Sequence, residues 1–180
     1  MKITATILFA FIILSANNFA QKDTVLLRTK GYSNITEFCM TGLTDGTDYS
    51  ELNVALQTIN GYKFNPYFNL GLGTGFEGYA TFTSEHIVYP MFLLFGDLRI
   101  CFTKKKFTPF LSFSQGYAFR LSNDSLDEYA SGILTNFTFG IKKRLLSKRE
   151  FHFGIGYRIQ ESYHNRKDYT GFSMKTGYTF

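Results

Sequence analysis

Residues 65–79, with the sequence NPYFNLGLGTGFEGY, constrain the fold most strongly because their side chains alternate in character. From Phe68 onward, apolar positions such as Leu70, Leu72 and Phe76 alternate with a set of asparagine, glycine and glutamate residues. A period of two is that of a β-strand, in which successive side chains point to opposite faces. Glycines and hydrogen-bonding side chains suit a narrow barrel interior, so we expect the apolar side to face outward into lipid.

The same alternation continues to Phe180 and predicts eight strands. The expected strands span residues 30–43, 49–59, 65–79, 87–102, 107–120, 131–143, 151–160 and 169–180. In the first of them we expect Glu37 to point inward and Phe38 outward, although Ile35 breaks the alternation. Lipid offers no hydrogen bonds to the backbone, so strands that cross it must close into a barrel. The sequence therefore predicts an all-β fold, an eight-stranded antiparallel up-and-down transmembrane β-barrel.

The amino terminus has the pattern of a secretory signal peptide. Lys2 supplies a positive start, residues 3–14 are mostly apolar, and Ala20 precedes the expected cleavage site, with Ala16 as the alternative. The apolar run is shorter than the about 20 residues that span a membrane. We expect residues 1–20 to be removed, residues 21–29 to form a short polar lead-in, and residues 30–180 to form the barrel.

Charge and cysteine content exclude other classes of protein. Loss of residues 1–20 removes Lys2 and no acid, so 18 basic residues remain against 14 acidic ones and the formal charge is +4. The lysine run at residues 104–106 falls between strands rather than on one face, which argues against a nucleic-acid partner. Cys39 and Cys101 fall on the first and fourth strands, which do not adjoin in such a barrel, so we expect no disulfide.

Tyrosines and connections predict the orientation in the membrane. Tyrosines near strand ends are expected to form a girdle at the membrane–water boundary: Tyr67, Tyr79, Tyr89, Tyr129, Tyr163, Tyr169 and Tyr178.

Short connections at residues 60–65, 103–106 and 144–149 are assigned to the periplasm. The connections that contain Asp45, Glu85 and Asp127 are acidic, and we expect them outside, where they would form the contact surface for an extracellular partner.

Several short motifs carry a resemblance to a known family. They are GYKFNPYF at residues 61–68, GLG at residues 71–73, Asp97-Leu98-Arg99, Pro109-Phe110 leading to Gly116-Tyr117, and the terminal Tyr178-Thr179-Phe180. Through these motifs the chain resembles small outer-membrane β-barrel proteins of Bacteroidetes-type bacteria, with barrels of the OmpA and OmpX kind. The resemblance implies an eight-stranded barrel in the bacterial outer membrane, with no catalytic residues and no cofactor. Such a fold does not by itself assign a function.

Seven charged residues share the inward parity and form the candidate site, a barrel-interior charge network: Glu77, Asp97, Arg99, Arg120, Lys142, Arg158 and Lys175. Eight strands leave an interior just wide enough for side chains, and buried charges must pair. We therefore expect an internal salt-bridge network that plugs the barrel. The alternative is a narrow cation-lined path for anions, since five of the seven residues are basic.

Catalysis and metal binding have weak support. Two loop groups combine a serine, a histidine and an acid: Ser84, Glu85 and His86, and Glu161, Ser162 and His164. A nucleophile must lie within hydrogen-bond reach of its base, which adjacency in a loop does not establish. The three histidines, His152 among them, have no metal-ligand spacing. We expect no catalytic residues and no bound metal.

The predicted function is that of an integral outer-membrane β-barrel with a structural or surface-interaction role and a side-chain-filled interior. A narrow anion-preferring channel is the alternative, and an outer-membrane lipid-modifying enzyme is the third possibility. The expected partners are outer-membrane lipid, the barrel-insertion machinery during assembly, and an unidentified extracellular partner. Tyr178 and Phe180, which share the lipid-facing parity at the carboxyl end, resemble an assembly signal for that machinery.

Overall fold

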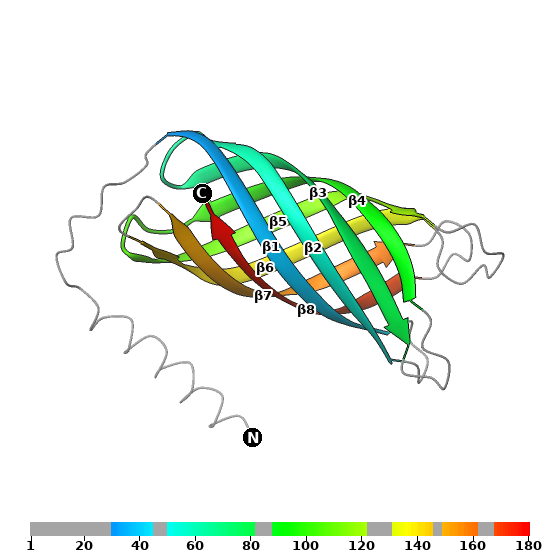
Figure 1. Cartoon of the computed structure of the whole chain (residues 1–180). Coiled ribbons are helices and arrows are strands. Elements are labelled where there is room, and N and C mark those ends of the chain that lie inside the picture. Colours follow the sequence, from blue (N-terminus) through cyan, green and yellow to red (C-terminus); the bar gives the residue numbers. More distant parts are fainter. Residues whose placement is uncertain (1–29, 45–49, 82–87, 122–130, 146–148, 162–167) are drawn as a thin grey trace, which may run out of the picture.

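The computed structural model describes residues 30–44, 50–81, 88–121, 131–145, 149–161 and 168–180. Figure 1 shows these residues as one barrel of tilted strands. The strands are β1 (Gly31–Thr44), β2 (Ser50–Lys63), β3 (Phe68–Thr81), β4 (Val88–Cys101), β5 (Phe107–Arg120), β6 (Gly132–Arg144), β7 (Glu150–Glu161) and β8 (Asp168–Thr179). No helix long and apolar enough to cross a membrane occurs in this described part of the chain.

The sheet closes on itself, because each strand pairs antiparallel with its neighbour in sequence and β8 pairs with β1. This closure gives both edges of the sheet a partner, so the ladder has no open edge. The start of β1 and the carboxyl terminus lie at the same end of the barrel (Figure 1), where Phe180 N donates to Asn34 O at 2.9 Å. The predicted fold class, an eight-stranded antiparallel up-and-down β-barrel, is confirmed.

Strand bounds follow the predicted ones closely, with a correction at the end of β2. The reversal predicted at Asn60 is wrong, because Tyr62 and Lys63 still pair with β3. The chain turns instead at residues 64–67, where Asn65 Oδ1 accepts hydrogen bonds from the backbone N–H groups of Tyr67 at 2.8 Å and Phe68 at 2.9 Å. An asparagine that bonds the backbone two and three residues ahead stabilises a turn, so Asn65 marks the true reversal.

Inward and outward side chains alternate as the period of two requires. The outward face exposes large apolar side chains on every strand, among them Leu56, Leu72, Phe139, Ile155 and Phe172, with exposed fractions that reach 70% for Leu72 and 80% for Phe172. Aromatic rings on neighbouring strands touch across this face, as Phe113 and Phe137 do with centroids 4.9 Å apart. The barrel therefore has an apolar outer belt.

The interior mixes apolar and polar side chains. Ile35 is buried and points inward with Glu37, so β1 alternates without interruption. Leu93 and Phe95 of β4 are also inside, and a Cβ atom built on Gly73 of β3 would overlap the ring of Phe95. Glycine at position 73 therefore makes room for a large apolar residue from the neighbouring strand.

Of the tyrosines predicted to form a girdle, two have exposed or partly exposed side chains and two are buried, which excludes the latter two from a girdle. Tyr67 is exposed at the rim and Tyr178 is partly exposed on the outward parity. Tyr79 and Tyr169 are instead buried inside, because they share the inward parity of Glu77 and Lys175 respectively. The remaining tyrosine side chains of the predicted girdle, those of Tyr89, Tyr129 and Tyr163, lie outside the described residues.

Candidate functional site in the barrel interior

Three groups of charged side chains lie one above another along the barrel axis. We call them the central cluster (Glu37, Asp97, Arg99, His152), the distal cluster (Glu77, Arg158) and the turn-end cluster (Lys63, Lys142, Arg144, Glu150). The turn-end cluster lies where the short connections at residues 64–67, 102–106 and 145–149 join the strands, and the distal cluster lies in the opposite half. All three arise because inward positions recur every second residue on each strand.

The central cluster joins strands from opposite sides of the barrel. Arg99 of β4 contacts Asp97 of its own strand, with Nε 2.6 Å from Oδ1, and Glu37 of β1, with Nη2 2.8 Å from Oε1. All three residues are buried, with Glu37 only 1% exposed. Buried charges are stable only when they are paired and hydrogen-bonded, and here one guanidinium serves two carboxylates.

Side chains from three more strands complete the central cluster. Gln57 Nε2 donates to Glu37 Oε2 at 2.7 Å, and Ser114 Oγ donates to Asp97 Oδ2 at 2.8 Å. His152 Nε2 lies 2.6 Å from Glu37 Oε1, and its ring packs edge-on against Phe110 at 5.7 Å between centroids. The carboxylates of the cluster therefore have acceptor sites filled by side chains from β2, β5 and β7.

The distal cluster is a second pair that spans the barrel. Arg158 of β7 donates through Nη2 to both carboxylate oxygens of Glu77 on β3, at 2.8 and 2.6 Å. Its Nη1 donates to Asn53 Oδ1 at 3.1 Å. Tyr79 Oη donates to Glu77 Oε1 at 3.0 Å and also bonds Gln160, which accepts from Arg158 Nη2 at 2.6 Å. The result is a hydrogen-bond network among β2, β3 and β7, in which the buried Arg158 Nε and Asn53 Nδ2 have no partner among the described residues.

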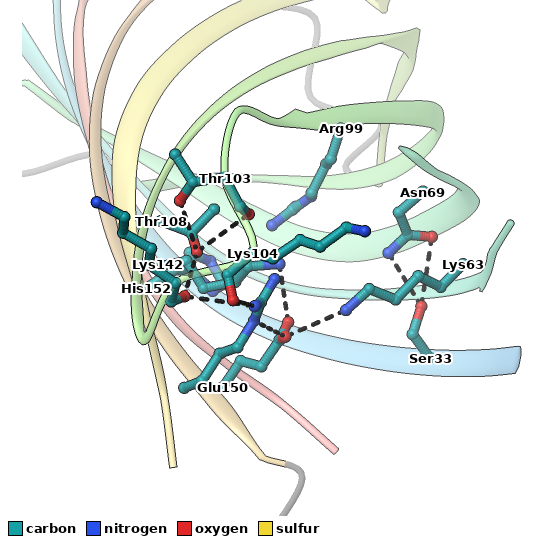
Figure 2. Close-up of polar contacts among 12 residues, drawn as sticks. Ser33, Lys63, Asn69, Arg99, Thr103, Lys104, Thr108, Lys142, Glu150 and His152 are labelled. Atoms are coloured by element: carbon teal, nitrogen blue, oxygen red, sulfur yellow. Dashed lines mark hydrogen bonds and ion pairs between the residues drawn. The ribbon is translucent and has the colours of Figure 1, made fainter. Parts of the chain in front are cut away.

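The turn-end cluster places three cations around one carboxylate. Glu150 Oε1 lies 3.2 Å from Lys63 Nζ and 3.3 Å from Arg144 Nε, and Oε2 lies 2.8 Å from Lys142 Nζ. Arg144 Nη1 also donates to the backbone carbonyl of Lys104 at 2.5 Å, which ties the end of β6 to the connection between β4 and β5. Figure 2 shows Lys63, Lys142 and Glu150 converging at this end of the barrel.

The structure brings five of the seven predicted network residues into these clusters and leaves two apart. Glu77, Asp97, Arg99, Lys142 and Arg158 have the ion pairs given above. Lys175 is 3% exposed and lines a cavity of about 10 Å³ together with Arg158, Gln57, Asn136 and other inward residues. Arg120 ends β5 and is only half-buried, with its backbone N–H donating to Ser131 Oγ at 3.1 Å.

Five ionisable residues of the clusters are not in the predicted network. They are Glu37, Lys63, Arg144, Glu150 and His152. Glu37 and His152 hold inward positions of their predicted strands, whereas the predicted strands end before Lys63 and Arg144 and begin after Glu150. Continuing the parity of Asn53 and Gln57 to the end of β2 would have placed Lys63 inside, so the signal was present in the sequence.

The serine–histidine–acid groups considered for catalysis fall mostly outside the described residues. These undescribed positions are Ser84, Glu85, His86, Ser162 and His164, and only Glu161, exposed at the end of β7, has a described side chain. Among the described residues, no group of three or more histidine, cysteine or acidic side chains is arranged to hold a metal. Cys39 and Cys101 are both buried, with free thiols.

Two solved structures with this fold are a bacterial surface protein and an outer-membrane enzyme. Neisserial surface protein A (NspA) superposes with a TM-score of 0.64 at 12% identity, covering 83% of this chain and 96% of that one. The outer-membrane enzyme PagL superposes with a TM-score of 0.51 at 9% identity, covering 79% and 97%. No protein-family model and no curated protein sequence matches the chain. At these identities the likeness shows the fold alone, a closed eight-stranded barrel of the outer-membrane kind.

Proposed function

We propose that this protein is an integral β-barrel of the bacterial outer membrane, with a structural or surface-interaction role and an interior closed by side chains. The observation that carries the proposal is the contrast between the two faces. Large apolar side chains cover the outside of all eight strands, while the inside contains paired charges together with other polar and apolar side chains. A soluble protein rarely exposes a contiguous apolar patch of more than a few hundred Å², whereas lipid is the solvent that such a belt requires.

The proposal includes the orientation and the partners. Short connections at residues 64–67, 102–106 and 145–149 would face the periplasm and the acidic connections the exterior, as in other barrels of this class. Lipid would cover the apolar belt, and an extracellular partner would contact the acidic connections. Residues 1–20 would act as the signal peptide that directs the chain to the envelope. The motifs at residues 61–73 and 97–99 support membership of the Bacteroidetes-type family of small barrels.

Closure of the barrel is the part of the proposal that distinguishes it from a channel. The central and distal clusters each connect opposite walls, and Leu93, Phe95 and Leu134 fill space between them. Purified protein refolded into a planar lipid bilayer should therefore show negligible ion conductance. Steady conductance with a preference for anions would replace this proposal with the channel.

A channel is the second candidate because inward cations exceed inward acids. Among the described residues, seven basic residues hold inward positions against four acids: Lys63, Arg99, Arg120, Lys142, Arg144, Arg158 and Lys175 against Glu37, Glu77, Asp97 and Glu150. A path lined in this way would favour anions. The paired charges lie across that path, so we propose the closed barrel in preference.

An enzyme is the third candidate, because PagL shows that a barrel of this fold can belong to an outer-membrane enzyme. In the described interior, His152 is bonded to Glu37 rather than to a serine or cysteine. A nucleophile activated by that histidine is therefore not present in this part of the chain. Substitution of Ser84 and Ser162 by alanine should leave the lipids of the host membrane unchanged, as judged by mass spectrometry.

A further inference from the structure

The turn-end cluster has more positive charge than its own acid can neutralise. Lys63, Lys142 and Arg144 all contact Glu150, and this carboxylate is the one acid among the described residues that pairs with them. Two formal positive charges therefore remain in a buried or nearly buried group. By contrast, each carboxylate of the central and distal clusters has a guanidinium partner.

The same residues have hydrogen-bond donors to spare. An ammonium group has three N–H donors. The structure gives Lys63 and Lys142 one acceptor residue each, Glu150. Arg144 Nη2 is buried and has no hydrogen-bond partner. Unsatisfied buried donors on charged groups are costly, so an anion that accepts from them would stabilise this end of the barrel.

A cavity adjoins the two lysines. It has a volume of about 30 Å³ and is lined by Lys63, Lys142 and Glu150, by Ser33 and Asn69, and by Arg99 and His152 of the central cluster, whereas Arg144 is not among its lining residues. Pro66 and the exposed Phe180 also line it, so the cavity reaches the rim. Figure 2 shows Ser33 and Asn69, which are hydrogen-bonded to each other, beside Lys63. This volume is about that of two ordered waters, which suits a compact polar group.

We propose that this turn-end cavity binds a phosphate group through Lys63 and Lys142. A phosphate monoester carries about −1.5 to −2 charge at neutral pH, which matches the two uncompensated positive charges. Lysine binds phosphate as a point charge and needs no bidentate geometry. Exposed Lys104 lies on the neighbouring connection and would attract such an anion toward the mouth. The phosphate could belong to a soluble molecule or to the headgroup of a lipid, and the chemistry of recognition is the same.

The proposal is tested with the refolded protein in a maltoside detergent free of phosphate. Inorganic phosphate is titrated by calorimetry at constant ionic strength, with chloride and sulfate as comparison anions. We expect saturable binding that is tighter for phosphate. Lys63→Met and Lys142→Met should each weaken it about tenfold, the effect of losing one charge-assisted hydrogen bond. Lys105→Met removes the same charge from an exposed site at the same end, and should change the affinity little.

Glu150→Gln separates binding from a purely structural role. Removing the carboxylate raises the excess from two positive charges to three, so phosphate should bind this variant more tightly than the natural protein and protect it more strongly against thermal unfolding. Three results would each overturn the proposal. They are weaker phosphate binding by Glu150→Gln than by the natural protein, equal binding of phosphate and chloride, and a loss of phosphate affinity in Lys105→Met as large as in Lys63→Met or Lys142→Met. Phosphatidic acid added to the micelles distinguishes the two sources of phosphate. If it displaces inorganic phosphate, the site is assigned to a lipid headgroup. If it does not displace inorganic phosphate, the site is assigned to a soluble phosphate.

Discussion

Arg99 on β4 and Glu37 on β1 lie on strands that are not neighbours, yet their side chains meet with Nη2 2.8 Å from Oε1. Arg158 on β7 and Glu77 on β3 repeat this relationship in the distal half, with Nη2 2.6 Å from Oε2. The ladder hydrogen bonds connect each strand only to its two neighbours. These two ion pairs are therefore connections across the lumen, in addition to the ladder that closes the barrel.

Removing one member of a cross-barrel pair should destabilise the barrel strongly. Arg99→Ala leaves Glu37 and Asp97 buried without their guanidinium, and Glu77→Ala leaves Arg158 without its carboxylate. We expect each to lower the free energy of unfolding by about 3–5 kcal/mol, the usual cost of breaking a buried pair. Urea titration in lipid vesicles measures this loss.

Two further variants control that experiment. Lys143→Met removes an exposed outward charge and should change the free energy of unfolding by about 0.5 kcal/mol or less. The double variant Glu77→Leu with Arg158→Met removes both charges and should be more stable than Glu77→Ala, because no unpaired charge remains. If Glu77→Ala lowers the free energy of unfolding no more than Lys143→Met does, the ion pair between Glu77 and Arg158 contributes little to stability.

Gly73→Ala tests the packing of the interior. The added methyl group would overlap the Phe95 ring, so we expect a loss of about 1–3 kcal/mol from overpacking. Gly42→Ala is the matched control, since a Cβ atom there has no neighbour within 4 Å. Combining Gly73→Ala with Phe95→Leu should recover part of the loss, and an absence of recovery would place the strain elsewhere. The measurement is again urea unfolding in vesicles.

Thiol labelling tests the proposed orientation. Cysteine introduced at Asp127 should react with a membrane-impermeant reagent on intact cells, and cysteine introduced at Lys105 should not, because Lys105 precedes β5 and Asp127 follows it in the sequence, and the two ends of β5 lie at opposite ends of the barrel. The natural cysteines, Cys39 and Cys101, are buried and should give a low background, which the unsubstituted protein measures. Labelling at Lys105 without labelling at Asp127 would reverse the topology.

Deletion of Phe180 tests the assembly signal. Phe180 is half-exposed on the outside and its ring contacts Tyr178 edge-on, with centroids 4.9 Å apart. As a lipid contact alone it would contribute at most about 1.5–3 kcal/mol, and less at a chain end. As a signal, its loss should reduce accumulation in the outer membrane far more than refolding in detergent. If the deletion reduces accumulation in cells and refolding in detergent by the same modest amount, Phe180 is a lipid contact and not a signal.

The alternation of side chains predicted the strands, the closure and the division between inside and outside. A period of two is a local property, so each strand could be recognised without knowing its neighbours. Ile35 shows the limit of this argument. Its apolar side chain breaks the predicted alternation, because the sequence predicts glycines and hydrogen-bonding side chains on inward positions. In the structure Ile35 does point inward, since part of the interior is apolar.

The partners of the inward residues could not be predicted in the same way. Which side chains meet across a lumen depends on the stagger of all eight strands and on the tilt that this stagger produces. Lys63 and Glu150 are 87 positions apart in the chain and meet only because both strands extend to the same rim. The acids and bases were therefore recognisable as interior residues, but their pairing required coordinates.

The pairing of β8 with β1 has a consequence for biogenesis. Ten residue pairs join Ile35–Thr44 to the segment that ends at Thr179, so the first strand made must wait for the last before it acquires its second neighbour. Until β8 has been made, the sheet has two unpaired edges, which other chains can join. The barrel can therefore close only after β8 has been synthesised, and a chain that lacks β8 is exposed to edge-to-edge association.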